Sequence, residues 1–270
     1  MSNQKRSDRF IIAGTAALAL CSVLAVFVLP TAPTYHGNWW GGHVPVAIAV
    51  VSTDLFLGST VMLLHNLRLY RKRLQQAYQM IAGCAGLVAA GAALSMYQQA
   101  ANTIHSTWAL ALTGLPFVAS GLLCCLAARS LGSLVGYSVS AWRIAAGHIG
   151  VLAAVTVLIA VIPNQHVPDR PALLIGFSNT MIVLGGIYNL MAGWMIIRIS
   201  RHMGAHYTHA VSLLGAAFCM GGLTVATYGL VHELQYLPGN TSIAGFNLCA
   251  VIVGILFIRA NYIFVKLRDF

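Results

Sequence analysis

Three titratable side chains recur at a spacing of eleven residues in the second apolar run of the chain. They are His43, Asp54 and His65. Eleven residues of α-helix turn about 20° beyond three full turns, so all three lie on one face and span about 33 Å. That length is close to the thickness of a membrane's hydrocarbon core. Such a face could relay protons or hold a haem near one edge. Alternatively, each histidine contacts lipid headgroups and water.

Asp54 is the most informative of the three because it lies near the predicted midplane of the membrane. An isolated carboxylate there costs roughly 2.5–3.5 kcal/mol on insertion scales, so such residues face the bundle interior and mark function. A second polar stripe, Thr224-Tyr228-His232, recurs every four residues and leads to Glu233. It could line a quinone or solute pocket, or it could make ordinary interhelical hydrogen bonds. The candidate catalytic residues are Asp54, Tyr228 and Glu233.

Each of the four predicted outer turns carries at least one histidine. Imidazole is the commonest metal ligand and titrates near neutral pH, so converging turns could bind copper, haem iron or zinc. Outer turns also collect polar residues for reasons unrelated to metals. The candidate metal ligands are His36, His43, His105, His166 and His232.

Two further histidines, His65 and His148, lie near the predicted inner boundary. If the second and fifth spans touch, these side chains could bind the two faces of one haem. The alternative is that each contacts headgroups by itself. The predicted cofactor is therefore haem b or copper.

The composition predicts that membrane helices position these groups. The chain has 270 residues, of which 59% are hydrophobic and 7% charged, whereas about a quarter of a soluble domain is charged. A span needs about 20 apolar residues, which leaves too little chain for a separate domain, and the sequence contains no Walker-type phosphate loop. The eight predicted spans are 10–30, 44–65, 78–98, 106–127, 143–163, 171–197, 208–231 and 242–264.

The distribution of basic residues predicts the orientation. With both termini in the cytoplasm, fourteen of the 15 Lys and Arg lie inside and only Arg170 lies outside. Cytoplasmic loops carry such an excess. We therefore predict a multi-pass protein of the inner (cytoplasmic) membrane, whose net charge of +10 requires no nucleic acid as a partner.

The two halves of the sequence resemble each other. Residues 9–14 align with 142–147, and residues 52–58 align with 179–185, which places Asp54 opposite Met181. An offset of four spans preserves orientation, so the prediction is a parallel 4+4 tandem repeat, 1–135 and 136–270, with ligand sites where the halves meet. A chance match between two sets of small apolar residues is the alternative.

Three functions are compatible with these observations. Ten histidines against five acids favour an integral membrane redox protein, which binds haem or another metal through the outer histidines and exchanges electrons with a quinone or a protein partner. The first alternative is a proton-coupled transporter of a small solute, in which Asp54 is the coupling acid and Thr53, Ser178 and Asn189 line the midplane. The second is a non-catalytic membrane subunit of a larger complex, because 26 glycines permit close packing of helices in the lipid bilayer.

Overall fold

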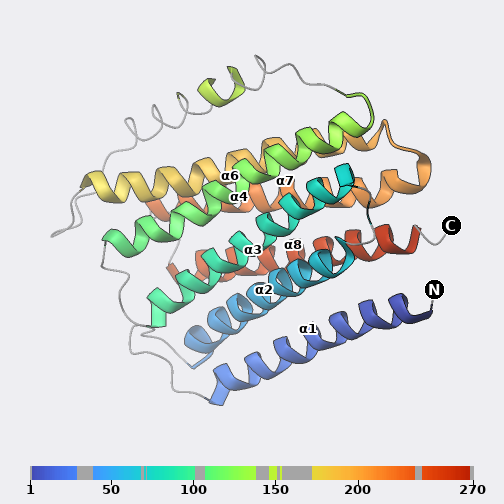
Figure 1. Ribbon diagram of the computed structural model, residues 1–270. Coiled ribbons are helices and arrows are strands. Elements are labelled where there is room, and N and C mark those ends of the chain that lie inside the picture. Colours follow the sequence, from blue (N-terminus) through green and yellow to red (C-terminus); the bar gives the residue numbers. More distant parts are fainter. Residues whose placement is uncertain are drawn as a thin grey trace.

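Seven long helices make up nearly all of the described structure (Figure 1). The computed structural model describes residues 2–28, 39–67, 70, 72–100, 107–137, 146–150, 153, 172–234 and 239–267, and this part of the chain contains no strand. A short helical stretch covers residues 146–150. The long helices are α1 (Ser2–Val28), α2 (Trp39–Asn66), α3 (Lys72–Ala100), α4 (Thr107–Leu134), α6 (Ala172–Ser200), α7 (Ala205–Leu234) and α8 (Gly239–Leu267).

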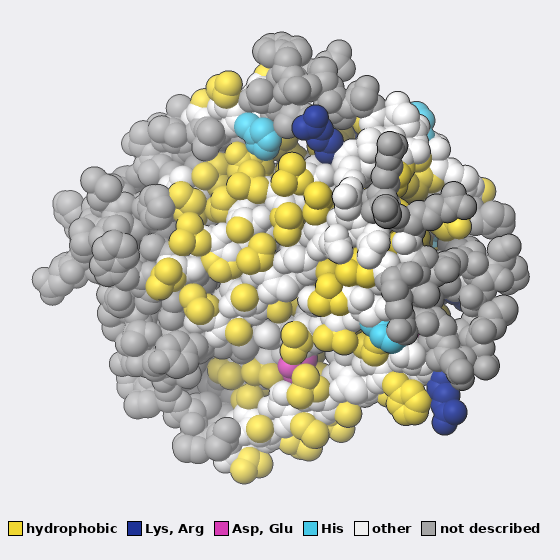
Figure 2. Space-filling view, viewed as in Figure 1, with side chains coloured by type: hydrophobic (Ala, Val, Ile, Leu, Met, Phe, Trp, Pro, Cys, Tyr) yellow, Lys and Arg dark blue, Asp and Glu magenta, His cyan; other side chains and the backbone are white. Residues whose placement is uncertain are grey.

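All seven long helices contain a segment that is long and apolar enough to cross a membrane. They coincide with seven of the eight predicted spans, and the eighth, 143–163, lies mostly outside the described residues. Large apolar side chains are exposed along them, such as Leu20 at 62% and Val28 at 83%. Figure 2 shows hydrophobic side chains over the middle of one face of the bundle. The chain is therefore a multi-pass membrane helix bundle with lipid-facing surfaces.

Six of the helices close a ring. The pairs in contact are α2–α3, α3–α4, α4–α6, α6–α7, α7–α8 and α8–α2, whereas α1 lies outside the ring against α2. The α4–α6 pair is parallel, since Gly121 lies against Tyr188 and Gly132 lies against Ile199. The α8–α2 pair is also parallel, as the contacts of Gly254 with Leu55 and of Phe257 with Phe56 show.

Helices α6 and α7 approach each other backbone to backbone. Gly186 and Gly193 lie seven residues apart on α6, and Gly215 and Gly222 have the same spacing on α7. A Cβ added at Gly186 or Gly193 would lie 2.5 Å from a backbone nitrogen of α7. Only glycine fits there, and this is how small residues bring membrane helices together.

The packed core lies toward the end of the bundle where α1 begins and α8 ends, which we call the termini end (Figure 1). The largest fully buried apolar side chains include Leu63, Ile81, Leu131, Ile196 and Leu214. All five lie in the part of their helix that is nearest the termini end. That half of the bundle is therefore solid, and any internal space must lie on its other side.

Candidate functional site

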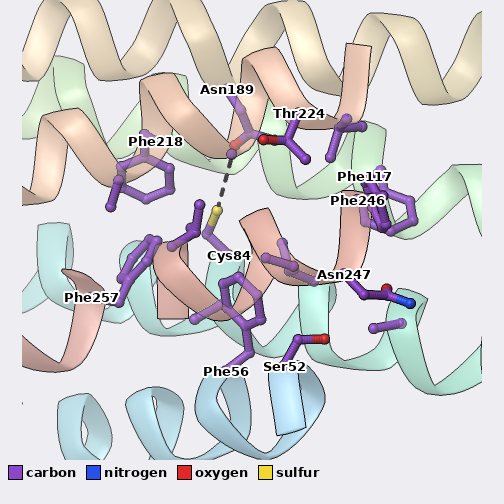
Figure 3. Close-up of a pocket in the computed structure, with 18 of the residues that line it drawn as sticks. Ser52, Phe56, Cys84, Phe117, Asn189, Phe218, Thr224, Phe246, Asn247 and Phe257 are labelled. Atoms are coloured by element: carbon purple, nitrogen blue, oxygen red, sulfur yellow. Dashed lines mark hydrogen bonds between the residues drawn. The ribbon is translucent and has the colours of Figure 1, made fainter. Parts of the chain in front are cut away.

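A cavity of about 90 Å³ lies inside the six-helix ring. All six ring helices contribute to its wall, and none of the residues that line it is charged. Its polar side chains are Ser52, Cys84, Asn189, Thr224 and Asn247 (Figure 3). Its aromatic side chains are Phe56, Phe117, Phe218, Phe246 and Phe257. The wall is thus mostly apolar with a few neutral hydrogen-bonding groups, as is typical of sites for small organic molecules.

Three phenylalanines close the cavity toward the termini end. The ring of Phe257 lies 6.1 Å from that of Phe56 and 4.8 Å from that of Phe218, both edge to face. Each lies at or next to the last residue that its helix contributes to the wall on that side. Behind them, in the described part of the bundle, lies the packed core.

The polar wall of the cavity joins α3, α4 and α6. The Nδ2 group of Asn189 donates to the Gly185 carbonyl at 2.9 Å, which fixes the orientation of the amide. The Sγ atom of Cys84 lies 2.8 Å from the Ser120 Oγ and 3.9 Å from the Asn189 Oδ1. Of these polar residues, the sequence analysis singled out Thr224, on the polar stripe, and Asn189, as a midplane residue of the transporter alternative. The others are neutral residues without a motif, and the one available signal was their helical spacing within each span.

Asp54 lies outside the cavity, on the side of α2 that faces α1. It is buried, with 9% of its surface exposed, which agrees with the expectation that a membrane carboxyl avoids lipid. The Ser22 side chain of α1 hydrogen-bonds to it, and its Oδ2 atom has no hydrogen-bond partner among the described residues. Ser52 and Phe56, two residues away on either side, line the cavity. Asp54 therefore does not share the cavity.

Asp54 belongs instead to a line of polar contacts between α1 and α2, which we call the α1–α2 seam. Its members are Ser7 with His65 (Oγ to Nε2, 2.9 Å), Asp8 with Asn66 (Oδ1 to Nδ2, 3.3 Å), Thr15 with Gly58, and Ser22 with Asp54. In lipid such contacts, rather than the hydrophobic effect, hold helices together. The polar residues of α1 at positions 8, 15 and 22 recur every seven residues, so one face of α1 carries the seam.

The two inner histidines are not brought together. His65 contacts Ser7 of α1. The ring of His148 lies 4.9 Å from that of Tyr188 on α6, and its buried Nδ1 atom has no hydrogen-bond partner. Helices α2 and α6 stand three positions apart in the ring of six, so these histidines contact opposite sides of the bundle. The predicted haem between them has no support in this arrangement.

The outer candidate ligands fall outside what the structure describes. His36, His105 and His166 are not among the described residues, and for His43, Tyr228, His232 and Glu233 only the helical backbone is described. Within the described ranges, no group of three or more His, Cys, Asp or Glu side chains could hold a metal ion. The outer metal or haem site stays a prediction. An absorbance spectrum with metal analysis of the purified protein tests it: a Soret band that shifts on reduction supports it, and a colourless preparation without stoichiometric iron or copper rejects it.

In comparisons with known proteins, no family model, no curated protein and no solved structure matches this chain.

Proposed function

We propose that this protein is a membrane transporter that binds a small organic solute in the central cavity, between two four-helix repeats. The cavity carries this proposal, because it lies where a repeated transporter places its substrate. This is the solute-transport alternative of the sequence analysis; of the midplane residues named there, Asn189 lines the cavity.

The spacing of the lining residues supports the repeat. Fourteen of them form seven pairs that are each 133 residues apart: 49 with 182, 56 with 189, 84 with 217, 85 with 218, 88 with 221, 92 with 225 and 117 with 250. The same spacing relates the Gly121–Tyr188 contact to the Gly254–Leu55 contact. An approximate twofold axis through the cavity would produce this pattern.

The order of helices in the ring supports the same axis. A rotation by three positions around the ring of six helices places α2 on α6, α3 on α7 and α4 on α8. The same rotation places the parallel α4–α6 contact on the parallel α8–α2 contact. Gly14 and Gly147 are also 133 residues apart, as the alignment of the first and fifth runs predicts. In the second and sixth spans the spacing of 133 replaces the predicted 127, so Ile187 rather than Met181 corresponds to Asp54.

Transport would require the two halves to move against each other. The α4–α6 and α8–α2 contacts are the boundaries between the halves, and rocking at these boundaries would separate Phe56 of the first half from Phe218 and Phe257 of the second. The described basic side chains of that end are Arg6, Arg9, Arg129, Arg198, Arg201, Arg259 and Lys266. Because basic residues mark the cytoplasmic side, we propose that the termini end is cytoplasmic.

A substitution that fills the cavity tests the proposal. Ala85 lines the cavity at the position that corresponds to Phe218. Ala85→Phe therefore adds a phenyl ring to the five that already line the cavity. The control Leu126→Phe adds a ring on α4 at a side chain that is 51% exposed to lipid. Both variants are reconstituted in liposomes, and uptake is followed by swelling across a panel of small neutral, cationic and anionic organic solutes.

We expect faster uptake of at least one solute by the wild type and by Leu126→Phe, and the protein-free rate with Ala85→Phe. Wild-type liposomes that match protein-free liposomes for every solute would refute transport. Equal rates for the wild type and Ala85→Phe would refute the cavity as the site.

A further inference from the structure

The two hydroxyl groups that line the cavity already donate hydrogen bonds to carbonyls of their own helices. The Oγ of Ser52 donates to the Ala49 carbonyl at 2.8 Å, and the Oγ1 of Thr224 donates to the Met220 carbonyl at 2.7 Å. Back-bonding of this kind is common for Ser and Thr within helices. A hydroxyl that donates to its own helix still offers lone pairs, so both side chains present acceptors to a ligand.

Asn189 presents a third acceptor. Its Nδ2 group donates to the Gly185 carbonyl, so its Oδ1 faces the cavity, where the one donor among the described residues is the Cys84 thiol at 3.9 Å. A thiol is a weak donor, and this one lies closer to the Ser120 Oγ and carbonyl, at 2.8 and 3.2 Å. Asn189 is 6% exposed. A buried amide oxygen without a strong donor is an unfavourable arrangement that a ligand can relieve.

Figure 3 shows Asn189 and Thr224 beside each other on one wall, with Ser52 on the opposite wall and phenylalanine rings between them. None of the described lining residues is charged, and burying an unpaired charge is costly. The favoured ligand is therefore neutral. The cavity volume of about 90 Å³ is smaller than the 150 Å³ of an engineered cavity that binds benzene, so the body of the ligand must be compact.

We infer that the cavity binds a small neutral molecule that donates an O–H or N–H hydrogen bond to the Oδ1 of Asn189, with its apolar part against the phenylalanines. This inference rests on the proposed function and names the class of its solute. A molecule of the same size that can only accept hydrogen bonds would leave the amide oxygen unpaired and would bind more weakly.

Two fluorinated probes test the inference by ligand-observed ¹⁹F NMR on the full chain in nanodiscs. 3,3,3-Trifluoropropan-1-ol has an O–H donor, and its isomer 2,2,2-trifluoroethyl methyl ether lacks it. We expect the alcohol to bind the wild type about tenfold more tightly than the ether, which is the effect of one buried hydrogen bond. The preference should vanish in Asn189→Leu, and binding of both probes should be lost in Ala85→Phe.

A second pair of variants keeps the test independent of the folding of Asn189→Leu. Thr224→Val removes one cavity acceptor at nearly constant volume, and we expect weaker binding of the alcohol. Thr60→Val removes a similar back-bond, to the Phe56 carbonyl at 2.9 Å. The Thr60 side chain lies beside Gly86 of α3 and is not itself among the lining residues, so this variant should leave binding unchanged.

The outcomes separate the two proposals. Binding that Ala85→Phe abolishes but that does not distinguish the alcohol from the ether would overturn this inference and leave the proposed site intact. Binding that Ala85→Phe does not change, or no binding of either probe to the wild type, would overturn the cavity as a ligand site and this inference with it.

Discussion

Replacing Gly121 and Gly254 by alanine should destabilise the protein at the two boundaries between its halves. An added Cβ at Gly121 would lie 2.6 Å from the Tyr188 Cβ and 2.9 Å from the Gly185 carbonyl oxygen, and one at Gly254 would lie 2.7 Å from the Leu55 Cβ. Ordinary contact begins at 3.4 Å, so each boundary must open by about 0.8 or 0.7 Å. The contacted atoms belong to helix backbone or are attached directly to it, so a rotamer change cannot relieve the clash.

Overpacking of this kind costs typically about 1–3 kcal/mol. The two sites lie in different helix pairs and share no contact residue, so their effects should add to within about 0.5 kcal/mol. The free energy of unfolding is measured by titration of mixed micelles with a denaturing detergent, for each single variant and for the double variant. The matched control is Gly14→Ala, because an added Cβ there meets nothing within 4 Å.

We expect Gly14→Ala to stay within about 0.5 kcal/mol of the wild type, as surface substitutions do. If Gly121→Ala and Gly254→Ala were also this close to the wild type, the tight contact between the halves would be wrong. If one variant were severely unstable and the other neutral, the proposed equivalence of the two boundaries would fail.

Three further predictions concern the α1–α2 seam and the closed end of the cavity. Asp54→Asn keeps a hydrogen-bond partner for Ser22 but cannot ionise. If Asp54 couples protons to transport, solute uptake in liposomes should lose its pH dependence in this variant while expression stays normal. An unchanged pH dependence of uptake would show that Asp54 does not couple protons. Asn66→Leu removes the donor that Asp8 accepts at 3.3 Å and should lower the free energy of unfolding by about 1–3 kcal/mol, whereas a wild-type detergent midpoint would mean that the contact contributes nothing. Phe218→Ala should lower the free energy of unfolding by about 3–5 kcal/mol, as large-to-small core substitutions do. The same detergent titration measures this change, and a decrease below about 1 kcal/mol would contradict the described packing.

The membrane spans could be predicted because the bilayer imposes a length and a composition that any span must meet. The cavity could not, since its wall uses the same residue types as the lipid-facing surface. Phe56 is buried beside the cavity and Phe10 is 66% exposed, and neither residue type nor hydropathy separates them. Only the packing of six helices decides which apolar face is internal.

The position of Asp54 shows a second limit of sequence reasoning. Burial of a membrane carboxyl follows from its desolvation cost, and the structure agrees with it. The desolvation cost does not predict where the carboxyl is buried, because a peripheral helix shields it from lipid as well as the centre of the bundle does. Here the serine of α1 at position 22 and the small Gly58 allow α1 to lie close to α2. Asp54 and His65 therefore mark the face of α2 that meets α1 rather than a shared interior pocket, whereas the side chain of His43 lies outside what the structure describes.

The closed ring has a consequence for assembly. A bundle fragment made of α2, α3 and α4 has two different edges, one formed by α2 and the other by α4. In the full chain the α4 edge contacts α6 and the α2 edge contacts α8. Helix α6 is the counterpart of α2 and helix α8 is the counterpart of α4 under the proposed repeat. Two identical copies of this fragment would form a closed ring of six helices, because a twofold rotation brings the α4 edge of each copy against the α2 edge of the other. No edge would then remain free to add further copies as a filament. If the chain is the proposed tandem repeat, a gene encoding one half would have specified a homodimer that encloses a symmetric compartment. Fusion of the two copies would then let each wall change alone, and the lining pairs Asn189 with Phe56 and Phe218 with Ala85, each 133 residues apart, are unlike residues of this kind.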